Sequence, residues 1–423
     1  MNDEFINARP SDELAPQAGT PDRRDPAVVV PEISVVIPAY NAVRFLDATL
    51  ASVAAQTFRA IEIIIVDDGS DDGTPALIKD WARRDSRIVS VRMENGGVAK
   101  ARNRGIAVAR AEFVAFVDAD DLWHPDKLRL QIEELRAAGP DCAAAYVLYR
   151  MIDIDGRVTA NGPTFTCSGY IYTRHLRFHL IGNGSSLLVR RSAALAVGGF
   201  DPTYAAEGIG GCEDLDFEIR LAAQWKIAGV PLFLLGYRRY DGNMSSDRHR
   251  MVRAMARTID RNLASGPKVP RVAHRGARIA VLEYSVHAYV MRRDLIRAAV
   301  LLAELLAINP RMAIRVVKRL YKFVAKRLAQ NGRGGAAWHS PESAPMFESL
   351  TPQDGLDQPV PPYISGPLRA AERVDGALWR RLKHDAATAP ASGVEAERAL
   401  TSAPAEAGAE RAWAAGGVSP RHG

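Results

Sequence analysis

The sequence predicts an α/β fold in which a mostly parallel sheet is flanked by helices. Two observations support this prediction. Short apolar segments rich in β-branched residues alternate with segments of helical periodicity in the N-terminal part of the chain. Polar residues follow each apolar segment directly, and the carboxyl ends of parallel strands form the edge at which such sheets bind ligands.

The first elements alternate regularly between strand and helix. Each strand stops at residues that favour turns, such as Pro38 after the first strand and Gly69 after the second. Single helices between strands indicate βαβ units. The expected order is a strand over 33–37, a helix through 45–53, a strand over 61–66, a helix from about 74, a strand over 87–91 and a helix over 98–109.

The next strand, 113–117, runs directly into three carboxylates, Asp118, Asp120 and Asp121. A strand buried on both faces cannot hold unpaired carboxylates, so we expect all three to project from its carboxyl end. Carboxylates one residue apart at such an edge suit a hard divalent cation that also holds substrate phosphates. The alternative is a solvated acidic turn that precedes a helix.

Five ordered elements resemble the family 2 glycosyltransferases, which have the GT-A fold of nucleotide-diphospho-sugar transferases. They are V-V-I-P-A-Y-N at 35–41, V-D-D-G-S at 66–70, N-G-G-V-A-K-A-R-N-R-G at 95–105, V-D-A-D-D at 117–121, and G-G-F-D followed by C-E-D-L-D within 198–216. The resemblance implies a Rossmann-like GT-A domain over 31–245, with a donor half (31–141) and an acceptor half (142–245). No G-x-G-x-x-G follows the first strand, which argues against a dinucleotide-binding dehydrogenase.

The resemblance implies a nucleotide-sugar site on the donor half. By resemblance, one of Asp67 and Asp68 accepts the ring N–H of the base, and we favour Asp68. One of Lys100, Arg102 and Arg104 reaches the base or the diphosphate. The alternatives are turn and capping roles for the carboxylates and a solvated helix face for the cations. The complete expected set is Pro38, Tyr40, Asn41, Asp67, Asp68, Lys100, Arg102, Asp118 and Ala119.

In the pattern of the family, Asp120 is the principal ligand of a Mg²⁺ or Mn²⁺ ion. Asp118 contacts either the ribose or the metal. Such an ion would neutralise the charge that develops on the departing diphosphate.

A helix is predicted to begin at Glu213. In the family, the Asp of this Glu-Asp pair is the general base, which makes Asp214 the expected base and Glu213 a supporting residue. At about 100° per residue, Asp216 falls on one polar stripe with Arg220, so we expect it to be solvated and paired with Arg220. Asp214 falls toward the apolar side, where it can line a cleft. The alternative for Glu213 and Asp214 is favourable charge in the first turn of a helix.

Together these residues predict an inverting, metal-dependent transfer of a sugar from a nucleotide-diphospho-sugar, preferably a UDP-sugar. The expected acceptor is a hydroxyl of a glycan or of a lipid-linked sugar in bacterial-type cell-surface polysaccharide synthesis. A Q-x-x-R-W motif and membrane-spanning runs are both missing from the sequence, which argues against a processive synthase. The alternatives are a nucleotidyltransferase and a non-catalytic nucleotide-sugar or glycan-binding module of the same fold.

A basic helical region is expected over 246–330. Between Arg250 and Gln330 there are 18 Lys and Arg against 4 Asp and Glu, in a chain whose net charge is +6. Basic amphipathic helices can lie on anionic lipid, which makes peripheral contact with a membrane one expectation for 250–330. The alternative is a helical bundle with a basic solvent face. No nucleic-acid-binding module is recognised, so no nucleic acid is expected.

The two ends of the chain are expected to be disordered. Residues 1–30 combine prolines with charges and lack the apolar core of a signal peptide. Residues 331–423 hold 10 of the 25 prolines. Deletion of 1–28 and 336–423 is therefore expected to leave the melting temperature and donor hydrolysis nearly unchanged. Three widely spaced cysteines indicate neither a disulfide framework nor a zinc site, and a cytoplasmic protein is the simplest expectation.

Overall fold

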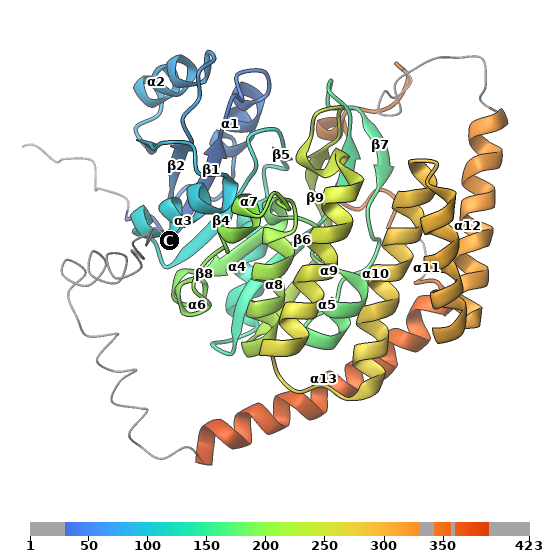
Figure 1. Ribbon diagram of the computed structural model, residues 1–423. Coiled ribbons are helices and arrows are strands. Elements are labelled where there is room, and N and C mark those ends of the chain that lie inside the picture. Colours follow the sequence, from blue (N-terminus) through green and yellow to red (C-terminus); the bar gives the residue numbers. More distant parts are fainter. Residues whose placement is uncertain (1–29, 330–341, 357–359, 389–423) are drawn as a thin grey trace, which may run out of the picture.

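The computed structural model describes residues 30–329, 342–356 and 360–388. Its centre is one nine-stranded sheet with helices on both faces (Figure 1). The strands are β1 (Ile33–Ala39), β2 (Ile61–Asp67), β3 (Ile88–Arg92), β4 (Phe113–Phe116), β5 (Leu122–Trp123), β6 (Cys142–Ile152), β7 (Val158–Asn161), β8 (Leu187–Arg190) and β9 (Lys226–Arg238). Their order across the sheet is β3-β2-β1-β4-β8-β6-β9-β5, and β7 pairs with β6 at the side.

Thirteen α-helices and three short 3₁₀ turns are found among the described residues. The helices are α1 (Leu46–Ala54), α2 (Thr74–Arg84), α3 (Val98–Val108), α4 (Lys127–Ala137), α5 (Tyr172–Phe178), α6 (Arg191–Ala196), α7 (Thr203–Ala206), α8 (Glu213–Gln224), α9 (Arg248–Ser265), α10 (Arg271–Met291), α11 (Leu295–Ile308), α12 (Pro310–Ala329) and α13 (Pro362–Thr388). The 3₁₀ turns are η1 (Gly184–Ser186), η2 (Met244–Ser246) and η3 (Phe347–Ser349).

The α/β fold with helices on both faces is confirmed, but the sheet is mixed rather than mostly parallel. β1 pairs in parallel with β2 and β4, and β2 pairs in parallel with β3, as the alternation of strands and helices predicts. Beyond β4 that alternation ends. β8 lies antiparallel to both β4 and β6, and β5 lies antiparallel to β9. Only β6 and β9 form a further parallel pair.

The strand residues divide between two cores, one on each face of the sheet. Along β1, Val35 and Ile37 pack with α1, α2 and α4, whereas Val36 packs with α3, α5, α6 and α8. Every residue of β1 and of β2 is buried, so neither strand shows the alternation of a half-exposed strand. This double burial leaves the strand ends as the only places where polar side chains can reach solvent or a ligand.

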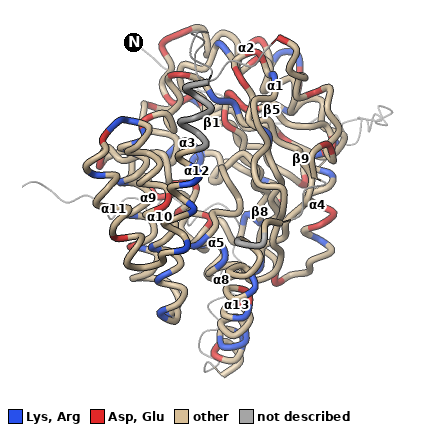
Figure 2. The backbone as a smooth tube through the Cα atoms, turned by 90° about the vertical axis from the view of Figure 1, so that its right-hand side faces the viewer, with Lys and Arg blue, Asp and Glu red and all other residues tan. Residues whose placement is uncertain are grey.

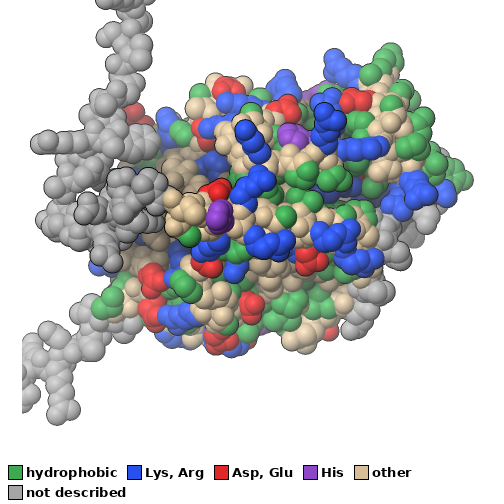
Figure 3. Space-filling model, turned by 90° about the horizontal axis from the view of Figure 1, so that it is seen from below, with side chains coloured by type: hydrophobic (Ala, Val, Ile, Leu, Met, Phe, Trp, Pro, Cys, Tyr) green, Lys and Arg blue, Asp and Glu red, His purple; other side chains and the backbone are tan. Residues whose placement is uncertain are grey.

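The basic region forms a helical layer outside the second face. α9 packs on α8 and α10, α10 also packs on α5 and α11, and α12 packs on α11 (Figure 1). Lys and Arg are spread along these helices, as Figures 2 and 3 show. A small separate core holds α10, α11 and α12 together, formed by Ile279, Leu282, Val286, Leu305, Met312, Ala313 and Val316. Within the described ranges, no helix is both long enough and apolar enough to cross a bilayer.

The prediction of disorder from 331 onward is wrong for two segments. Residues 342–356 lie against the sheet, where buried Arg150 donates through Nη2 to the carbonyl oxygens of Thr351 and Asp354, both at 2.8 Å. Phe347 is buried beside Leu122 and Ile152. The remaining parts of the predicted tails, 1–29, 330–341, 357–359 and 389–423, lie outside the described residues.

The second segment is α13, which docks on α5. Asp375 is fully buried and accepts hydrogen bonds from Thr173 N at 2.7 Å and from Arg174 Nε at 2.9 Å. The Trp379 ring packs on that of Tyr170, with centroids 5.3 Å apart. Composition alone suggested disorder because this part of the chain is rich in proline. It could not show that Asp375 has a buried partner about 200 residues earlier in the chain.

We expect Asp375→Ala to lower the free energy of unfolding by about 3–5 kcal/mol, because Arg174 would remain buried without its charge partner. Chemical denaturation measures the difference. The matched control is Glu372→Ala, which removes an exposed carboxylate 3.6 Å from the same guanidinium and should cost at most about 1 kcal/mol. Equal stability of the two variants would show that α13 does not dock as described.

Candidate active site

A cavity of about 650 Å³ lies at the carboxyl ends of β1, β2 and β4. The start of α8, the end of β9 and the first turn of α9 close its other sides. All the predicted site residues except Asp67 and Lys100 line it: Pro38, Tyr40, Asn41, Asp68, Arg102, Asp118, Ala119, Asp120, Glu213 and Asp214. The structure therefore brings together residues that are up to 176 positions apart in the sequence.

Asp67 and Lys100 lie outside the cavity, in contrast to the prediction. Asp67 is buried, and its carboxylate accepts from Arg92 Nη1 at 2.7 Å and from Ser70 N at 2.9 Å. It therefore fixes the turn after β2. Lys100 is exposed on the outer side of α3. Of the three cations in α3 that were candidates for the site, only Arg102 lines the cavity, and Arg104 is exposed like Lys100.

Asp68 is held by a glycine turn. Its Oδ1 accepts from Gly96 N and its Oδ2 from Gly97 N, both at 2.8 Å. Gly97 has a φ of 87°, which a residue with a side chain rarely adopts. The two N–H groups fix the orientation of the carboxylate and leave each oxygen one further lone pair for a ligand donor. Tyr40 lines the same cavity and is 53% exposed, so its ring is open for stacking.

Arg102 is the buried cation of the cavity. Its Nη2 donates to Asp118 Oδ1 at 2.6 Å, and its guanidinium lies 5.1 Å from the centre of the Phe200 ring. Burial disfavours the charge of Arg102, but the charges of Asp118, Glu213 and Asp214 outweigh burial and raise its pKa. The guanidinium of Arg102 therefore interacts electrostatically with carboxylates of both the donor half and the acceptor half.

Two of the three carboxylates after β4 face the cavity. Burial, followed by the charge of Asp118, raises the pKa of Asp120 to about 6. Asp121 turns the other way, and its Oδ1 accepts from Arg238 N at 2.9 Å. The expectation that all three carboxylates project from the strand end is therefore wrong for Asp121. The pairing of β5 with β9 brings the backbone N–H of Arg238 to its carboxylate.

The donor set suits a divalent ion that the substrate helps to bind. Across the described ranges, no three His, Cys, Asp or Glu side chains are placed to enclose a metal. Mg²⁺, however, is usually held by one or two carboxylates together with water and substrate phosphates. Asp118 and Asp120 can supply the two carboxylates. The charge of Asp118 raises the pKa of Asp120, and a cation bound between the two would relieve this repulsion.

Asp214 faces these carboxylates from the start of α8. It is half-buried, and its Oδ1 accepts from Leu215 N at 2.7 Å. Burial, followed by the charges of Glu218 and Glu213, raises the pKa of Asp214 to about 8. Glu213 is buried, and its Oε2 accepts from Gly211 N at 2.6 Å, which ties the loop before α8 to the helix.

Behind Asp214 lies a buried acid–imidazole pair. Glu218 Oε2 is 3.2 Å from His175 Nε2, and both side chains are inaccessible to solvent. Burial lowers the pKa of His175 to about 3 and raises that of Glu218 well above its usual range. Both groups therefore lie in an environment that favours their neutral forms.

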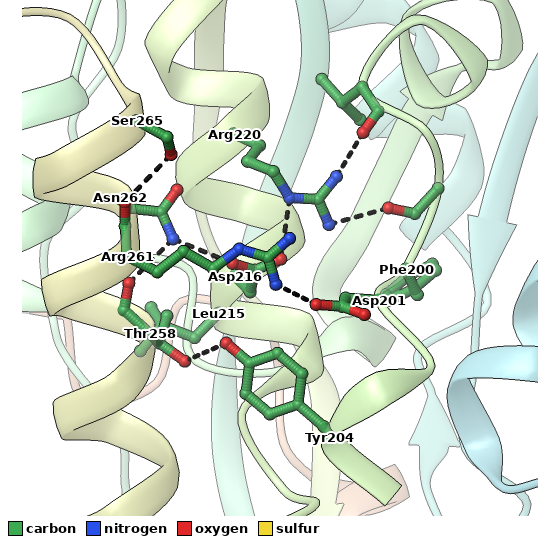
Figure 4. A network of polar contacts seen from close by, with 12 residues as sticks. Phe200, Asp201, Tyr204, Leu215, Asp216, Arg220, Thr258, Arg261, Asn262 and Ser265 are labelled. Atoms are coloured by element: carbon green, nitrogen blue, oxygen red, sulfur yellow. Dashed lines mark hydrogen bonds and ion pairs between the residues drawn. The ribbon is translucent and has the colours of Figure 1, made fainter. Parts of the chain in front are cut away.

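Asp216 is buried, whereas the helix-face argument predicted a solvated residue (Figure 4). Its pairing with Arg220 is confirmed, since Arg220 Nε donates to Asp216 Oδ2 at 2.7 Å. Asn262 of α9 donates to the other oxygen at 2.9 Å. Asp216 is buried because α9 packs on this side of α8. The periodicity of α8 could not predict this packing, since α9 begins 24 residues after α8 ends.

Several residues of the cavity were missed or left unassigned by sequence reasoning. Asn183 is buried at the cavity wall, and neither its Oδ1 nor its Nδ2 has a partner. Arg250 of α9 donates through Nη2 to Met244 O at 2.9 Å and lines the cavity. Tyr237, at the end of β9, and Asn243, in the loop after it, also line the cavity. For Arg250 we find no sequence signal.

We expect Asp214→Asn to stabilise the fold in a pH-dependent way. Between the ordinary pKa of 3.8 and the raised value of about 8, the folded chain binds a proton that the unfolded chain has lost. The free energy of unfolding therefore falls as pH rises through this range. Asparagine does not titrate, so the melting temperature of the variant should exceed that of the wild type at pH 8. The gain should shrink toward pH 4, and a gain independent of pH would contradict the assignment.

Residues 34–194 match the family model described as Glycosyl transferase family 2. The chain is 39% identical over 127 residues to the putative teichuronic acid biosynthesis glycosyltransferase TuaG of Bacillus subtilis, which covers 30% of this chain and 50% of the relative. It is 37% identical over 129 residues to the succinoglycan biosynthesis protein ExoO of Rhizobium meliloti, which covers 30% and 36%. The chain therefore spans half or less of the length of these relatives.

Among solved structures, S. aureus TarS in complex with UDP-GlcNAc is 18% identical, with a TM-score of 0.44 and coverage of 75% of this chain and 99% of that one. The mannosyltransferase PcManGT from Pyrobaculum calidifontis, in complex with GDP-Man and Mn²⁺, is 20% identical with a TM-score of 0.47, and covers 70% and 88%. Likeness at this level says nothing about the ligands of this chain. The sequence match of residues 34–194 identifies this part of the chain as a glycosyl transferase family 2 domain.

Proposed function

We propose that the protein transfers a sugar from a nucleotide-diphospho-sugar to a hydroxyl group, with inversion at the anomeric carbon and with the help of a divalent metal ion. The observation that carries this proposal is the meeting of two carboxylate pairs in one cavity. Asp118 and Asp120 come from the donor half, Glu213 and Asp214 come from the acceptor half, and Arg102 lies between the pairs.

The donor half supplies groups for a nucleotide. The exposed ring of Tyr40 can stack on a base, and Asp68 offers acceptor lone pairs in a fixed orientation. Asp120 would be the principal metal ligand, because one oxygen of Asp118 is already taken by Arg102. When bound, a Mg²⁺ or Mn²⁺ ion supplies positive charge against the departing diphosphate. Arg102 and Arg250 add fixed positive charge to the same cavity.

The acceptor half supplies the base. A carboxylate whose pKa is about 8 is a stronger base than an ordinary aspartate and is ionised in a useful fraction near neutral pH. Asp214 would take the proton of the acceptor hydroxyl as the hydroxyl oxygen bonds to the anomeric carbon. The bond from that carbon to the diphosphate breaks in the same step, so the configuration inverts and no covalent enzyme intermediate forms.

The relatives support a role in cell-surface polysaccharide synthesis. Two of them are named for teichuronic acid biosynthesis and for succinoglycan biosynthesis. We therefore propose a glycan or a lipid-linked sugar as the acceptor and a UDP-sugar as the first donor to test.

Donor hydrolysis tests the proposal directly. Incubated with a panel of UDP-, GDP- and dTDP-sugars, the purified protein should release nucleoside diphosphate from at least one donor in the presence of Mn²⁺ and not in the presence of EDTA. Asp120→Ala should abolish this release and remove Mn²⁺-dependent binding of the nucleoside diphosphate in calorimetry, with no loss of thermal stability. Donor binding without turnover would instead favour a non-catalytic module, and metal-dependent binding retained by Asp120→Ala would remove Asp120 from the site.

Two neighbouring carboxylates of α8 distinguish the base from a structural residue. Asp214→Asn keeps the shape of the side chain but removes its basicity, so the transfer rate constant should fall by roughly 10²–10⁴-fold while donor and metal affinity stay near wild type. Asp216→Asn should instead lower the free energy of unfolding by about 1–3 kcal/mol, because it weakens two buried bonds to Arg220 and Asn262. Its transfer rate per folded molecule should be near normal. A crippled Asp216→Asn beside a fully active Asp214→Asn would reverse the assignment.

A further inference from the structure

Exposed apolar side chains gather on one helical hairpin. Seven of the fourteen large apolar side chains that stand exposed in the described part of the chain lie on α11 and α12. Ile296 is 81% exposed and Tyr321 is 75% exposed. The complete set is Leu295, Ile296, Val300, Leu306, Ile314, Val317 and Tyr321. Exposed apolar residues scattered singly need no explanation, but a concentration of this kind on two successive helices indicates an interaction surface.

This surface is separate from the face that holds the hairpin in place. The inner sides of α11 and α12 pack on α10 through Leu305, Met312 and Val316, which are buried. On α12, Ile314, Val317 and Tyr321 recur at intervals of three and four residues and so share one side of the helix, about a third of a turn from the buried side. The hairpin therefore has a second apolar side that the fold does not use.

The segment that carries this surface is mostly positive, and one of its cations, Arg319, lies 3.2 Å from Glu283 of α10. Between 292 and 321 the only acids are Asp294, which lies 3.3 Å from Arg297, and Glu304, which lies 2.6 Å from Arg278. The basic residues of the same stretch are Arg292, Arg293, Arg297, Arg311, Arg315, Lys318 and Arg319. Toward the right-hand end of Figure 3, where α11 and α12 lie in Figure 1, hydrophobic side chains stand among Lys and Arg.

We propose that the outer side of α11–α12 docks on the surface of an anionic lipid bilayer. The apolar side chains would enter the boundary between headgroups and acyl chains, while the long Lys and Arg side chains reach the phosphates at the edge of the contact. A second copy of the chain would bring the same positive charge against this surface, and a nucleic acid offers nothing apolar to Ile296 or Val300. An anionic bilayer satisfies both the charge and the exposed apolar area.

Within the basic region, only the α11–α12 hairpin is proposed to contact the membrane. α9 and α10 also belong to the basic region, but they pack on α8, α5 and α11 and are not proposed to touch lipid. Docking does not rest on the proposed glycosyl transfer, since it depends only on the composition of the hairpin. If both proposals hold, the cavity would work at the surface where a lipid-linked acceptor lies.

Co-sedimentation with vesicles tests the inference. The full-length protein should sediment with vesicles of phosphatidylcholine and phosphatidylglycerol, bind at least tenfold more weakly to phosphatidylcholine alone, and be released by high salt. The double variant Ile296→Glu/Val317→Glu should lose at least tenfold in binding. Arg311→Glu/Lys318→Glu should lose binding to the anionic vesicles only. The control is Val272→Glu, which changes an apolar residue that is 60% exposed at the start of α10, and this variant should bind as the wild type does.

The competing outcomes are distinct. The proposal is wrong if the wild type ignores anionic vesicles, or if the hairpin variants bind as tightly as Val272→Glu does. Dimers in light scattering that Ile296→Glu/Val317→Glu abolishes, without vesicle binding by the wild type, would identify the surface as a self-interface instead. All three variants should hydrolyse the soluble donor at the wild-type rate, so failure of the proposed activity and failure of docking are separable.

Discussion

The arrangement of the cavity depends on the buried guanidinium of Arg102. Four carboxylates, Asp118, Asp120, Glu213 and Asp214, meet in a space that solvent only partly reaches. Without a cation among them, their repulsion and desolvation would oppose the closure of the two halves of the domain. Arg102 is bonded to Asp118 and is also close enough to Glu213 and Asp214 for their charges to raise its pKa. It is therefore the electrostatic link between the donor and acceptor halves.

Two glycines set the place of Arg102. A Cβ atom on Gly105 would lie 2.2 Å from a methyl carbon of Val36, so α3 approaches β1 as closely as it does only because residue 105 has no side chain. A Cβ atom on Gly184 would lie 3.2 Å from Arg102 Nη2, so η1 can close over the guanidinium. The same turn orients Asp118, whose N–H donates to Ser185 Oγ at 2.9 Å. The close packing at Gly105 and Gly184 therefore helps to position Arg102 and Asp118.

The local sequence pattern predicted which residues lie at the carboxyl edge of the sheet, but it did not predict which elements pack over them. The ends of β1, β2 and β4 follow from apolar runs that stop at polar residues, and this placed Asp68, Asp118 and Asp120 correctly at the cavity. The periodicity of α8 placed Asp214 on the cavity side. The failures share one cause: Asp216, Asp121 and Asp375 are buried by partners from other elements. A sequence pattern cannot show that a carboxylate is buried when its hydrogen-bond donor lies far away in the sequence. The antiparallel pairing of β8 with β4 also depends on long-range packing that local pattern does not reveal.

The raised pKa of Asp214 has a physical consequence for its proposed role as a base. Burial is the largest cause of the shift, and the charge of Glu218 is the next. Burial also raises the pKa of Glu218 well above its usual range, so both carboxyl groups lie in an environment that disfavours their charged forms. Burial is the largest cause of both shifts. In the proposed reaction, an acceptor that entered the cavity would exclude further water from Asp214, and this would strengthen the carboxylate as a base at the moment when the hydroxyl proton must be taken.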